Sequence, residues 1–293
     1  MKDRILEGKI ALVAGGTRGA GRGIAIALGE AGACVYVTGR STRESPSEMN
    51  RKETIEETAE IINANGGKGI AVKTDHTKAD EVRELALRID KEQGRLDILV
   101  NDIWGGDPYI RWDVKFWEHS LENGIKVQRT CLESHLNTNY FAAPLMIRNR
   151  SGLILEITDG IDYRYRGNLY YTLVKSSIIN LSRCLSEELK SFGITALSLT
   201  PGFLRSEAML DHFGVREENW KDATKKEPHF IVSETPAYIG RAVVSLAGDK
   251  NIFAKTGIST STWKLSEEYD FTDLDGSRPH WGNYFKEKFG EEL

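Results

Sequence analysis

Two residues in the second half of the chain have the types and spacing needed for proton transfer. Tyr171 and Lys175 stand four positions apart, so on a helix both side chains lie on one face. A free phenol titrates near ~10 and is inert at neutral pH, but a fixed positive charge beside it favours the phenolate and lowers its pKa. The pair could therefore act as a general acid/base, although the same spacing also occurs on solvated helix faces without chemistry.

A glycine-rich turn near the N-terminus gives this pair a context. It lies between an apolar strand pattern and a helix pattern. Glycine permits a positive φ and close backbone approach, and a helix N-terminus offers free N–H groups, so the turn can hold a dinucleotide pyrophosphate. The residues assigned to this contact are Gly15, Thr17, Arg18, Gly19, Ala20 and Gly21. The spacing GxxxGxG differs from the common GxGxxG fingerprint, and a plain tight connection is the alternative.

The end of the second expected strand bears on which dinucleotide binds. NAD-binding proteins usually place a carboxylate there for the adenosine ribose, whereas this chain reads Thr38-Gly39-Arg40-Ser41, without an acid. A guanidinium matches phosphate geometry with paired donors, and Arg18 could reach the same group as Arg40. We therefore expect NADP (NADPH) in preference to NAD, with two merely exposed arginines as the alternative.

The elements that must position these residues alternate between strand and helix patterns. Strands are expected over residues 9–14, 34–38, 69–74, 96–101, 153–158 and 194–200, and helices over 21–31, 53–65, 80–93, 117–146, 171–192 and 236–248. Such alternation is typical of a parallel sheet with helices on both faces. The sequence predicts an α/β fold, a three-layer doubly wound parallel sheet of the Rossmann type, with ligands at the carboxyl ends of the strands.

One domain is expected over residues 1–263, followed by a C-terminal tail over 264–293. Residues 203–234 lack clean periodicity and mix aromatic with charged side chains, which is typical of a mobile lid over a site. The tail is rich in aromatic residues, so we expect it to pack on the domain or on a neighbouring subunit. These aromatic residues are Tyr269, Phe271, Trp281, Tyr284 and Phe285.

Composition excludes several classes of function. The 293 residues carry 39 Lys and Arg against 43 Asp and Glu, a formal net charge of -4, which gives no electrostatic case for nucleic acid. No apolar stretch approaches the ~20 residues that span a bilayer, and the N-terminus lacks the apolar core of a signal peptide. Three scattered cysteines and six histidines show no metal-ligand spacing. We expect a cytoplasmic protein with no metal, nucleic-acid or membrane partner.

Taken together, these segments resemble the short-chain dehydrogenase/reductase family over residues 7–260. The matching pieces are the glycine turn, Asp75, Asn101, Tyr171-x-x-x-Lys175 and Thr200-Pro201-Gly202.

The resemblance implies roles in cofactor binding. Asp75 would contact the adenine, and His76, which follows it, is assigned to the same site. Asn101 would shape the adenosine side of the cleft, and Pro201 and Gly202 would line the nicotinamide. Each of these residues has a plainer alternative as a turn residue at the end of a strand.

The resemblance also implies that Tyr171 exchanges the substrate proton, while Lys175 binds the nicotinamide ribose and lowers the Tyr171 pKa. The family usually supplies a serine hydroxyl about a dozen residues upstream to polarise the carbonyl, but no serine occurs over residues 155–160. Thr158 lies 13 residues before Tyr171 and is predicted as the replacement donor. Alignment from the preceding strand places Asp159 there instead. An ionised Asp159 could not donate a hydrogen bond and would repel an oxyanion unless its pKa were raised.

A second departure concerns the helix before that strand, where the family often carries an asparagine that holds a water chain to the lysine. Cys131 stands at this position, and a thiol is a poor substitute for an amide, so proton relay could instead run through Gln128. The family's Asn-Asn-Ala-Gly segment is also altered, to NDIW over residues 101–104.

The primary hypothesis is an NADP(H)-dependent oxidoreductase that interconverts a carbonyl and a secondary alcohol. The rival, motivated by the altered serine and asparagine positions, is a catalytically weak NADP(H)-binding sensor or regulatory protein. The resemblance further implies a homotetramer or homodimer. Several large side chains in the loops after strands could wall a pocket for a small molecule with an apolar or aromatic part. They are Trp104, Tyr109, Tyr163, Tyr165, Phe203, Met209 and Trp220.

Overall fold

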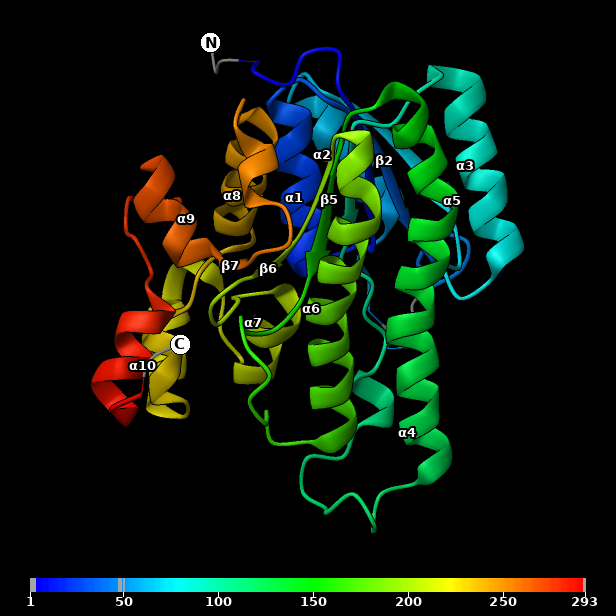
Figure 1. The fold of residues 1–293 in the computed structure, drawn as a ribbon. Helices are drawn as coiled ribbons and strands as arrows, with labels where there is room; N and C mark the ends of the chain where they lie inside the picture. The colour runs from blue at the N-terminus through cyan, green and yellow to red at the C-terminus, as the bar shows by residue number, and fades with distance from the viewer. Residues whose placement is uncertain (1–3, 47–48, 50, 292–293) are drawn as a thin grey trace.

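Seven parallel strands form the centre of the molecule, in the order β3-β2-β1-β4-β5-β6-β7 (Figure 1). The computed structural model describes residues 4–46, 49 and 51–291, so the first three residues of the expected domain and the last two of the expected tail lie outside the described residues. The strands are β1 (Ile10–Ala14), β2 (Cys34–Gly39), β3 (Lys68–Lys73), β4 (Ile98–Asn101), β5 (Gly152–Ile157), β6 (Ile194–Thr200) and β7 (Ser259–Ser261). The predicted α/β fold with a doubly wound parallel sheet is confirmed.

Helices cover both faces of this sheet (Figure 1). Apolar residues of α1, α2 and α8 pack on one face, and those of α3, α5 and α6 pack on the other. The helices are α1 (Gly19–Glu30), α2 (Ile55–Ala64), α3 (Ala79–Gln93), α4 (Leu121–Gln128), α5 (Ser134–Asn149), α6 (Leu169–Leu189), α7 (Glu207–Phe213), α8 (Pro236–Gly248), α9 (Thr262–Tyr269) and α10 (Trp281–Phe289).

The period of a strand divides its side chains between two cores. In β1, Ala11 and Val13 belong to the core under α1, α2 and α8, whereas Ile10 and Leu12 belong to the core on the opposite face. Successive side chains of a strand point to opposite faces of the sheet. A strand buried on both faces therefore needs a continuous apolar run, which is why these strands were readable from the sequence.

The expected helix over residues 117–146 is a composite. α4 continues through a π-helix over Arg129–Glu133 into α5. The rod formed by α4 and α5 lies beside α3 and α6 in Figure 1, and α4 packs on α6. π-turns inside helices occur frequently at functional sites, because they insert one residue and re-aim its neighbours.

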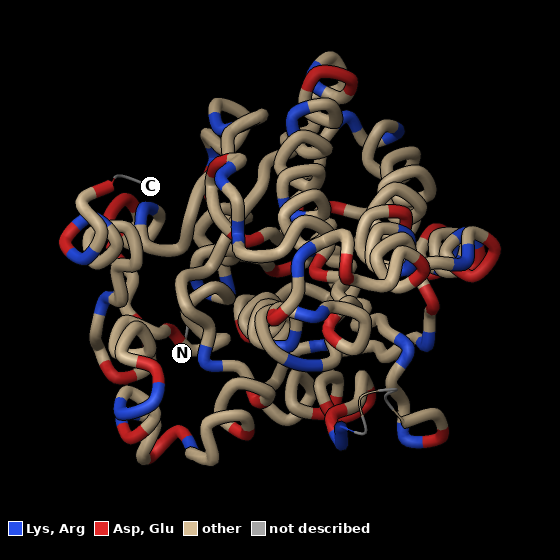
Figure 2. Tube along the Cα trace, turned by 90° about the horizontal axis from the view of Figure 1, so that it is seen from below, with Lys and Arg blue, Asp and Glu red and all other residues tan. Residues whose placement is uncertain are grey.

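Residues 203–234, called the lid segment below, contain α7 and two 3₁₀ helices over Glu217–Lys225 and Pro228–Val232. The tail ends in α10, which lies beside the lid segment at the edge of the molecule in Figure 1. Figure 2 shows Lys and Arg intermingled with Asp and Glu along the chain. No helix in the described part of the chain combines the length and apolarity that crossing a bilayer requires.

Candidate active site

A cavity of about 1070 Å³ lies at the carboxyl ends of the strands. It runs from the glycine turn after β1, past Tyr171 and Lys175 on α6, to the lid segment and α10. A crevice at this edge of an open parallel sheet is the usual ligand site of such folds. The cavity therefore brings together the two motifs on which the functional hypothesis depends.

The glycine turn packs so closely on neighbouring main-chain atoms that two of its positions have no room for a side chain. Gly15 has a φ of 91°, and a Cβ there would lie 2.3 Å from the main-chain oxygen of Asp102. A Cβ at Gly21 would lie 2.3 Å from the main-chain oxygen of Gly15. Two such clashes mean that both positions require glycine, since real Cβ atoms do not approach this closely. The turn therefore packs tightly against the segment after β4.

The first turn of α1 binds carboxylates through its N–H groups. The N–H of Gly19 donates to Oε2 of Glu207 at 2.8 Å, and the N–H of Gly21 donates to Oδ2 of Asp102 at 2.6 Å. Glu207 comes from α7 of the lid segment, and Asp102 follows β4. Free N–H groups and the helix dipole make this end of a helix a site for anions. The turn thus has the chemistry to hold a pyrophosphate.

Arginines and a polar turn lie at the adenosine end of the cavity. Arg18 and Arg40 both line it, as do Asp75 and His76. Desolvation lowers the pKa of Arg18 from its ordinary value, because its side chain is partly buried near the glycine turn. Asp75 accepts hydrogen bonds from the N–H and hydroxyl of Thr77 through Oδ1. The residues present fit an adenosine with a phosphate-bearing ribose.

Two predicted cofactor residues have side chains held by structural contacts, and of the two only His76 lines the cavity. The ring of His76 lies between the hydroxyls of Thr38 and Thr138, each 2.8 Å away, and burial lowers its pKa to about 3. Asn101 is fully buried and donates to Oε1 of Glu156 at 2.9 Å. The expectation that the Asn101 side chain shapes the cleft is thus not met, because β5 supplies a carboxylate partner inside the core.

A buried polar network that the sequence did not indicate surrounds Glu156. His135 Nδ1 lies 2.5 Å from Oε2 of Glu156, and Asn139 donates to Oε1 at 2.6 Å. His135 Nε2 also lies 3.3 Å from the main-chain oxygen of Ile103. The side-chain oxygens of Asn101 and Asn139 are buried without a hydrogen-bond partner among the described residues, so the network is only partly satisfied. The network joins β4, β5 and α5 directly behind the catalytic end of the cavity.

Cys131, which stands where the family often has an asparagine, and Gln128, the alternative relay residue, lie in the helices beside α6. Cys131 lies fully buried in the π-helix, and burial raises its thiol pKa to about 11, so the thiol stays neutral. The side chain of Gln128 donates to the main-chain oxygen of Tyr170 at 2.9 Å and ties α4 to α6. Both positions stabilise the helix packing behind the site.

Tyr171 and Lys175 lie on the cavity face of α6, as predicted. The side chain of Asn168 caps this helix by accepting the N–H of Tyr171 at 3.1 Å. The Lys175 ammonium lies 4.6 Å from the centre of the Trp104 ring, which packs edge-on against the Tyr171 ring. Trp112 packs against the same phenol with ring centroids 5.1 Å apart. Two indoles therefore fix the phenol beside the lysine.

The partner of the phenol is a carboxylate. The Tyr171 hydroxyl donates to Oδ2 of Asp159 at 2.8 Å. Burial, followed by the Asp159 charge, raises the Tyr171 pKa well above 10. The expected lowering by Lys175 is therefore not seen, because burial and the adjacent carboxylate both disfavour the phenolate. The Thr158 hydroxyl, in contrast, donates to the main-chain oxygen of Lys175 at 2.9 Å, which favours Asp159 over Thr158 as the group beside the phenol.

Arg166 is a further residue of the site, on the loop between β5 and α6. Its side chain is 9% exposed, and Nε lies 3.9 Å from Oδ2 of Asp159. It also donates to the main-chain oxygens of Arg164 and Asp162 and lies 3.4 Å from the Asp162 carboxylate. Gly160 has a φ of 79°, and a Cβ there would lie 1.7 Å from the Arg166 guanidinium, so glycine makes room for this arginine.

A buried carboxylate supports the predicted nicotinamide end from behind. Pro201 and Gly202 line the cavity, and the Gly202 N–H donates to Oε2 of Glu234 at 2.8 Å. Thr262 donates to the same oxygen at 2.7 Å. Burial raises the pKa of Glu234 to about 8. Glu234 thus fixes the backbone that follows β6.

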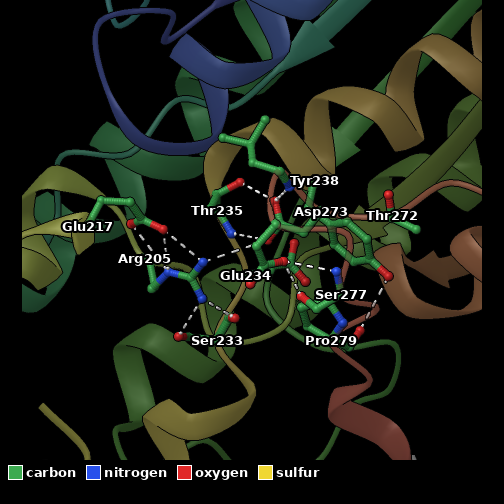
Figure 3. A network of polar contacts seen from close by, with 12 residues as sticks. Arg205, Glu217, Ser233, Glu234, Thr235, Tyr238, Thr272, Asp273, Ser277 and Pro279 are labelled. Carbon is green, nitrogen blue, oxygen red and sulfur yellow. Dashed lines mark hydrogen bonds and ion pairs between the residues drawn. The ribbon is translucent and has the colours of Figure 1, made fainter. Parts of the chain in front are cut away.

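Figure 3 shows that the same region ties both ends of the lid segment to the tail. Arg205, 3% exposed, donates to the main-chain oxygen of Ser233 at 2.5 Å, and its own N–H donates to the main-chain oxygen of Glu234 at 2.7 Å. Asp273 accepts the N–H of Thr235 at 2.8 Å. The base of the lid segment is therefore held by a desolvated network.

Several of the large side chains expected to wall a pocket line the cavity, joined by two from the tail. The residues that line it are Trp104, Tyr165, Phe203, Met209, Trp281 and Phe285. Tyr109, by contrast, packs with Trp104 against α6, and Trp220 packs on Phe230 within the lid segment. The tail thus contributes to the wall of the site in its own chain.

Comparison with known proteins gives consistent matches. A model of the short chain dehydrogenase family matches residues 9–213. The human "Dehydrogenase/reductase SDR family member 1" is 32% identical over 276 residues, 92% of this chain and 85% of that protein. A 3-oxoacyl-(acyl-carrier-protein) reductase from Staphylococcus epidermidis is 30% identical over 202 residues, 68% of this chain and 76% of the reductase. The crystal structure of a hydroxysteroid dehydrogenase from Escherichia coli superimposes with a TM-score of 0.70 at 23% identity, covering 89% of this chain and 98% of that one.

Proposed function

The chain belongs to the short-chain dehydrogenase/reductase family of nicotinamide-dependent oxidoreductases, and from that premise we propose that it is an NADP(H)-dependent enzyme interconverting a carbonyl and a secondary alcohol by hydride transfer. The observation that carries the proposal is the shared cavity of the glycine turn, Tyr171 and Lys175. A protein that only senses a dinucleotide has no need of a phenol fixed beside a lysine at the far end of the cavity. The staphylococcal relative is named for reduction of an oxo group.

The cofactor would be held along the length of the cavity. The N–H groups of the first turn of α1 would bind the pyrophosphate in place of the carboxylates that they now bind. Arg40 and Arg18 would pair with the ribose phosphate, which is the reason for preferring NADPH to NADH. Lys175 would bind the nicotinamide ribose. When bound, the reduced nicotinamide supplies a hydride.

Tyr171 would act as the proton donor. Its raised pKa keeps the phenol protonated at neutral pH, so the proton that carbonyl reduction consumes is present on the phenol. The phenol must turn its hydrogen bond from Asp159 to the substrate oxygen. Thr158 would support the reaction indirectly, through its contact with the main chain of Lys175.

We also propose that the protein forms a homodimer or homotetramer in the cytoplasm. Large apolar side chains are exposed on α4, α5 and α6, on the side of the sheet that carries Tyr171. They are Leu121, Ile125, Leu136, Tyr140 and Leu173. Exposed apolar side chains on neighbouring helices favour self-association across a two-fold axis. Light scattering on the purified protein would give the number of subunits.

The test of the function is binding followed by turnover. Titration with NADPH and NADH, read by fluorescence, should show tighter binding of NADPH. Absorbance of reduced nicotinamide should then fall on addition of at least one ketone, aldehyde or quinone from a broad panel. Tight binding without turnover across the panel would favour the sensor, and the absence of binding would remove both functions.

A further inference from the structure

The polar group that touches the phenol is negatively charged, where a carbonyl-reducing site needs a donor. Asp159 accepts the Tyr171 hydroxyl at 2.8 Å, lines the cavity and is 49% exposed. A substrate atom that interacts with the phenol must lie within hydrogen-bond reach of it, about 2.6–3.2 Å. Such an atom is then within about 6 Å of the Asp159 carboxylate. The charge of Asp159 therefore acts directly on the reacting group.

This charge opposes the reduction of a carbonyl. Hydride addition to C=O places negative charge on the oxygen, and a carboxylate at this distance raises the energy of that charge. The nearby cations offset this charge only in part, because Arg166 shares its ion pairing between Asp159 and Asp162. Arg166 lies 3.9 Å from Asp159 but is engaged by Asp162 and by the main-chain oxygen of Arg164. The Lys175 ammonium lies over the Trp104 ring.

The same charge suits a cationic acceptor. Tyr171 donates to Oδ2 of Asp159, and no described residue donates a hydrogen bond to Oδ1. Because Asp159 lines the cavity and is half exposed, this second oxygen is available to a ligand. The Trp112 ring packs on the same phenol but lines a neighbouring hollow, so the aromatic ring beside the phenol inside the cavity is Trp104. Faces of indole rings attract cations, and Trp104 already holds the Lys175 ammonium. The Asp159 carboxylate is therefore the group at this end of the cavity that can pair with a positively charged nitrogen.

We propose that the hydride acceptor of this enzyme is an iminium ion, a positively charged C=N bond, with Asp159 as its counter-ion. The inference rests on the proposed hydride transfer and redefines its substrate class from C=O to C=N⁺. The hydride electron pair forms the new C–H bond, and the π pair of C=N⁺ becomes the nitrogen lone pair. The nicotinamide is oxidised by two electrons and the product is an amine, so the step requires no proton. Tyr171 then orients Asp159.

The change in charge on the substrate nitrogen during hydride transfer determines whether loss of the Asp159 carboxylate alters KM or kcat. Positive charge on nitrogen disappears as the hydride arrives, so Asp159 stabilises the bound iminium ion at least as much as the transition state. An interaction of this kind acts on KM more than on kcat. Removing the charge of Asp159 should therefore raise KM for an iminium ion by roughly tenfold, with a smaller change in kcat. The same change should improve the kcat/KM of a ketone.

The test compares matched substrates on the full-length protein with NADPH. An N-methyl dihydroisoquinolinium salt is a permanent cation that cannot lose a proton, and tetralone is a neutral bicyclic ketone of similar size. Both are assayed by nicotinamide absorbance, with a protein-free blank for direct reduction by NADPH. The variants are Asp159→Asn and Asp159→Ser. Asp113→Asn is the control, because Asp113 is an exposed carboxylate paired with Arg111 outside the cavity.

The expected result is a kcat/KM for the salt at least about tenfold above that for tetralone, with the preference reduced or reversed in both Asp159 variants and retained in Asp113→Asn. If one Asp159 variant fails to fold, the other still measures the charge effect. Tetralone reduced as well as or better than the salt by the unmodified protein would overturn the inference and leave the carbonyl function standing. Reduction of neither substrate, with NADPH bound, would overturn the inference, and the broad carbonyl panel would then decide whether hydride transfer stands.

Discussion

The two ends of the cavity are built from different parts of the chain. At the cofactor end the contacts come from main-chain N–H groups of α1, held in place by glycines that tolerate no Cβ. At the chemical end they come from side chains, Tyr171, Asp159 and Arg166, carried by α6 and by the loop after β5. A main-chain site is constrained by geometry, whereas a side-chain site can change its chemistry by single substitutions. The cofactor end should therefore fail through steric change and the chemical end through loss of functional groups.

The largest effect is expected from Tyr171→Phe, which removes the proton donor and leaves the ring packing intact. The kcat for ketone reduction should fall by about 10³-fold, within the usual contribution of a general acid. NADPH affinity should remain within about threefold of its original value, because the phenol is not part of the phosphate site. Tyr163→Phe, at an exposed tyrosine, serves as the control. Lost affinity with normal turnover would contradict the separation of the two ends.

Glu234 lies where the two ends meet, and its pKa of about 8 predicts how stability depends on pH. This value lies above the ordinary 4.5, so between these pH values the folded state keeps a proton that the unfolded state has released. The contribution of Glu234 to stability is therefore undiminished below pH ~4.5 and declines as pH rises toward ~8. Glu234→Gln keeps an acceptor for Gly202 and removes the charge.

Urea unfolding of this variant should show a gain of about 3 kcal/mol at pH ~8 and little change at pH ~5. The exposed Glu187→Gln should behave like the unmodified protein at both pH values. If Glu234→Gln and the unmodified protein were equally stable at pH ~8, the pKa of Glu234 would not be raised in the folded state, and the prediction would be wrong.

At the cofactor end, Gly21→Ala tests the steric rule. Its methyl group would lie 2.3 Å from the Gly15 oxygen and 2.9 Å from the Asp102 carboxylate, so the turn must shift. We expect a loss of about 2 kcal/mol in the free energy of unfolding and NADPH binding at least about tenfold weaker. Gly94→Ala adds a methyl group in open space, at a residue whose φ of 69° is positive, unlike that of Gly21 in α1. It should lose about 1 kcal/mol through backbone strain alone and bind NADPH normally.

The smallest effect is expected at the adenosine end, where Arg40→Ala should weaken NADPH by about tenfold, as expected for one charge-assisted contact, and leave NADH unchanged. Isothermal titration with both cofactors measures the difference. Arg43→Ala is the control, since Arg43 is exposed and pairs with Glu60. Equal weakening of both cofactors, or of neither, would remove the case for NADP.

Most of the fold could be predicted from the sequence because its strands are apolar runs buried on both faces. β7 could not be predicted: it reads Ser259-Thr260-Ser261 and is a strand only because it pairs with β6. The helix α10 of the tail could not be predicted either. It has no buried residue, and its position is determined by aromatic contacts with the lid segment. Such elements are stabilised by tertiary contacts, which leave no periodic signal.

The candidate site likewise has one part that could be predicted from the sequence and one part that could not. The glycine turn and the Tyr171 and Lys175 pair were readable because each depends on residues close in sequence. Whether Thr158 or Asp159 lies beside the Tyr171 phenol depends on a shift of one residue in the alignment of this segment. The N–H of Thr158 still pairs with the Leu199 oxygen of β6, so the sheet alternation continues and adjacent side chains take opposite directions. Thr158 then faces the main chain of α6, and Asp159 meets the phenol.

The contact between Glu207 and the Gly19 N–H makes the lid segment a competitor for the cofactor site. One N–H cannot bind a carboxylate and a phosphate oxygen fully at once, so the affinity of the turn for a pyrophosphate includes the work of displacing α7. By thermodynamic linkage, whatever strengthens the Glu207 contact weakens cofactor binding by the same factor. The apparent cofactor affinity of this chain is therefore a property of the lid as much as of the glycines, and the two can be tuned separately.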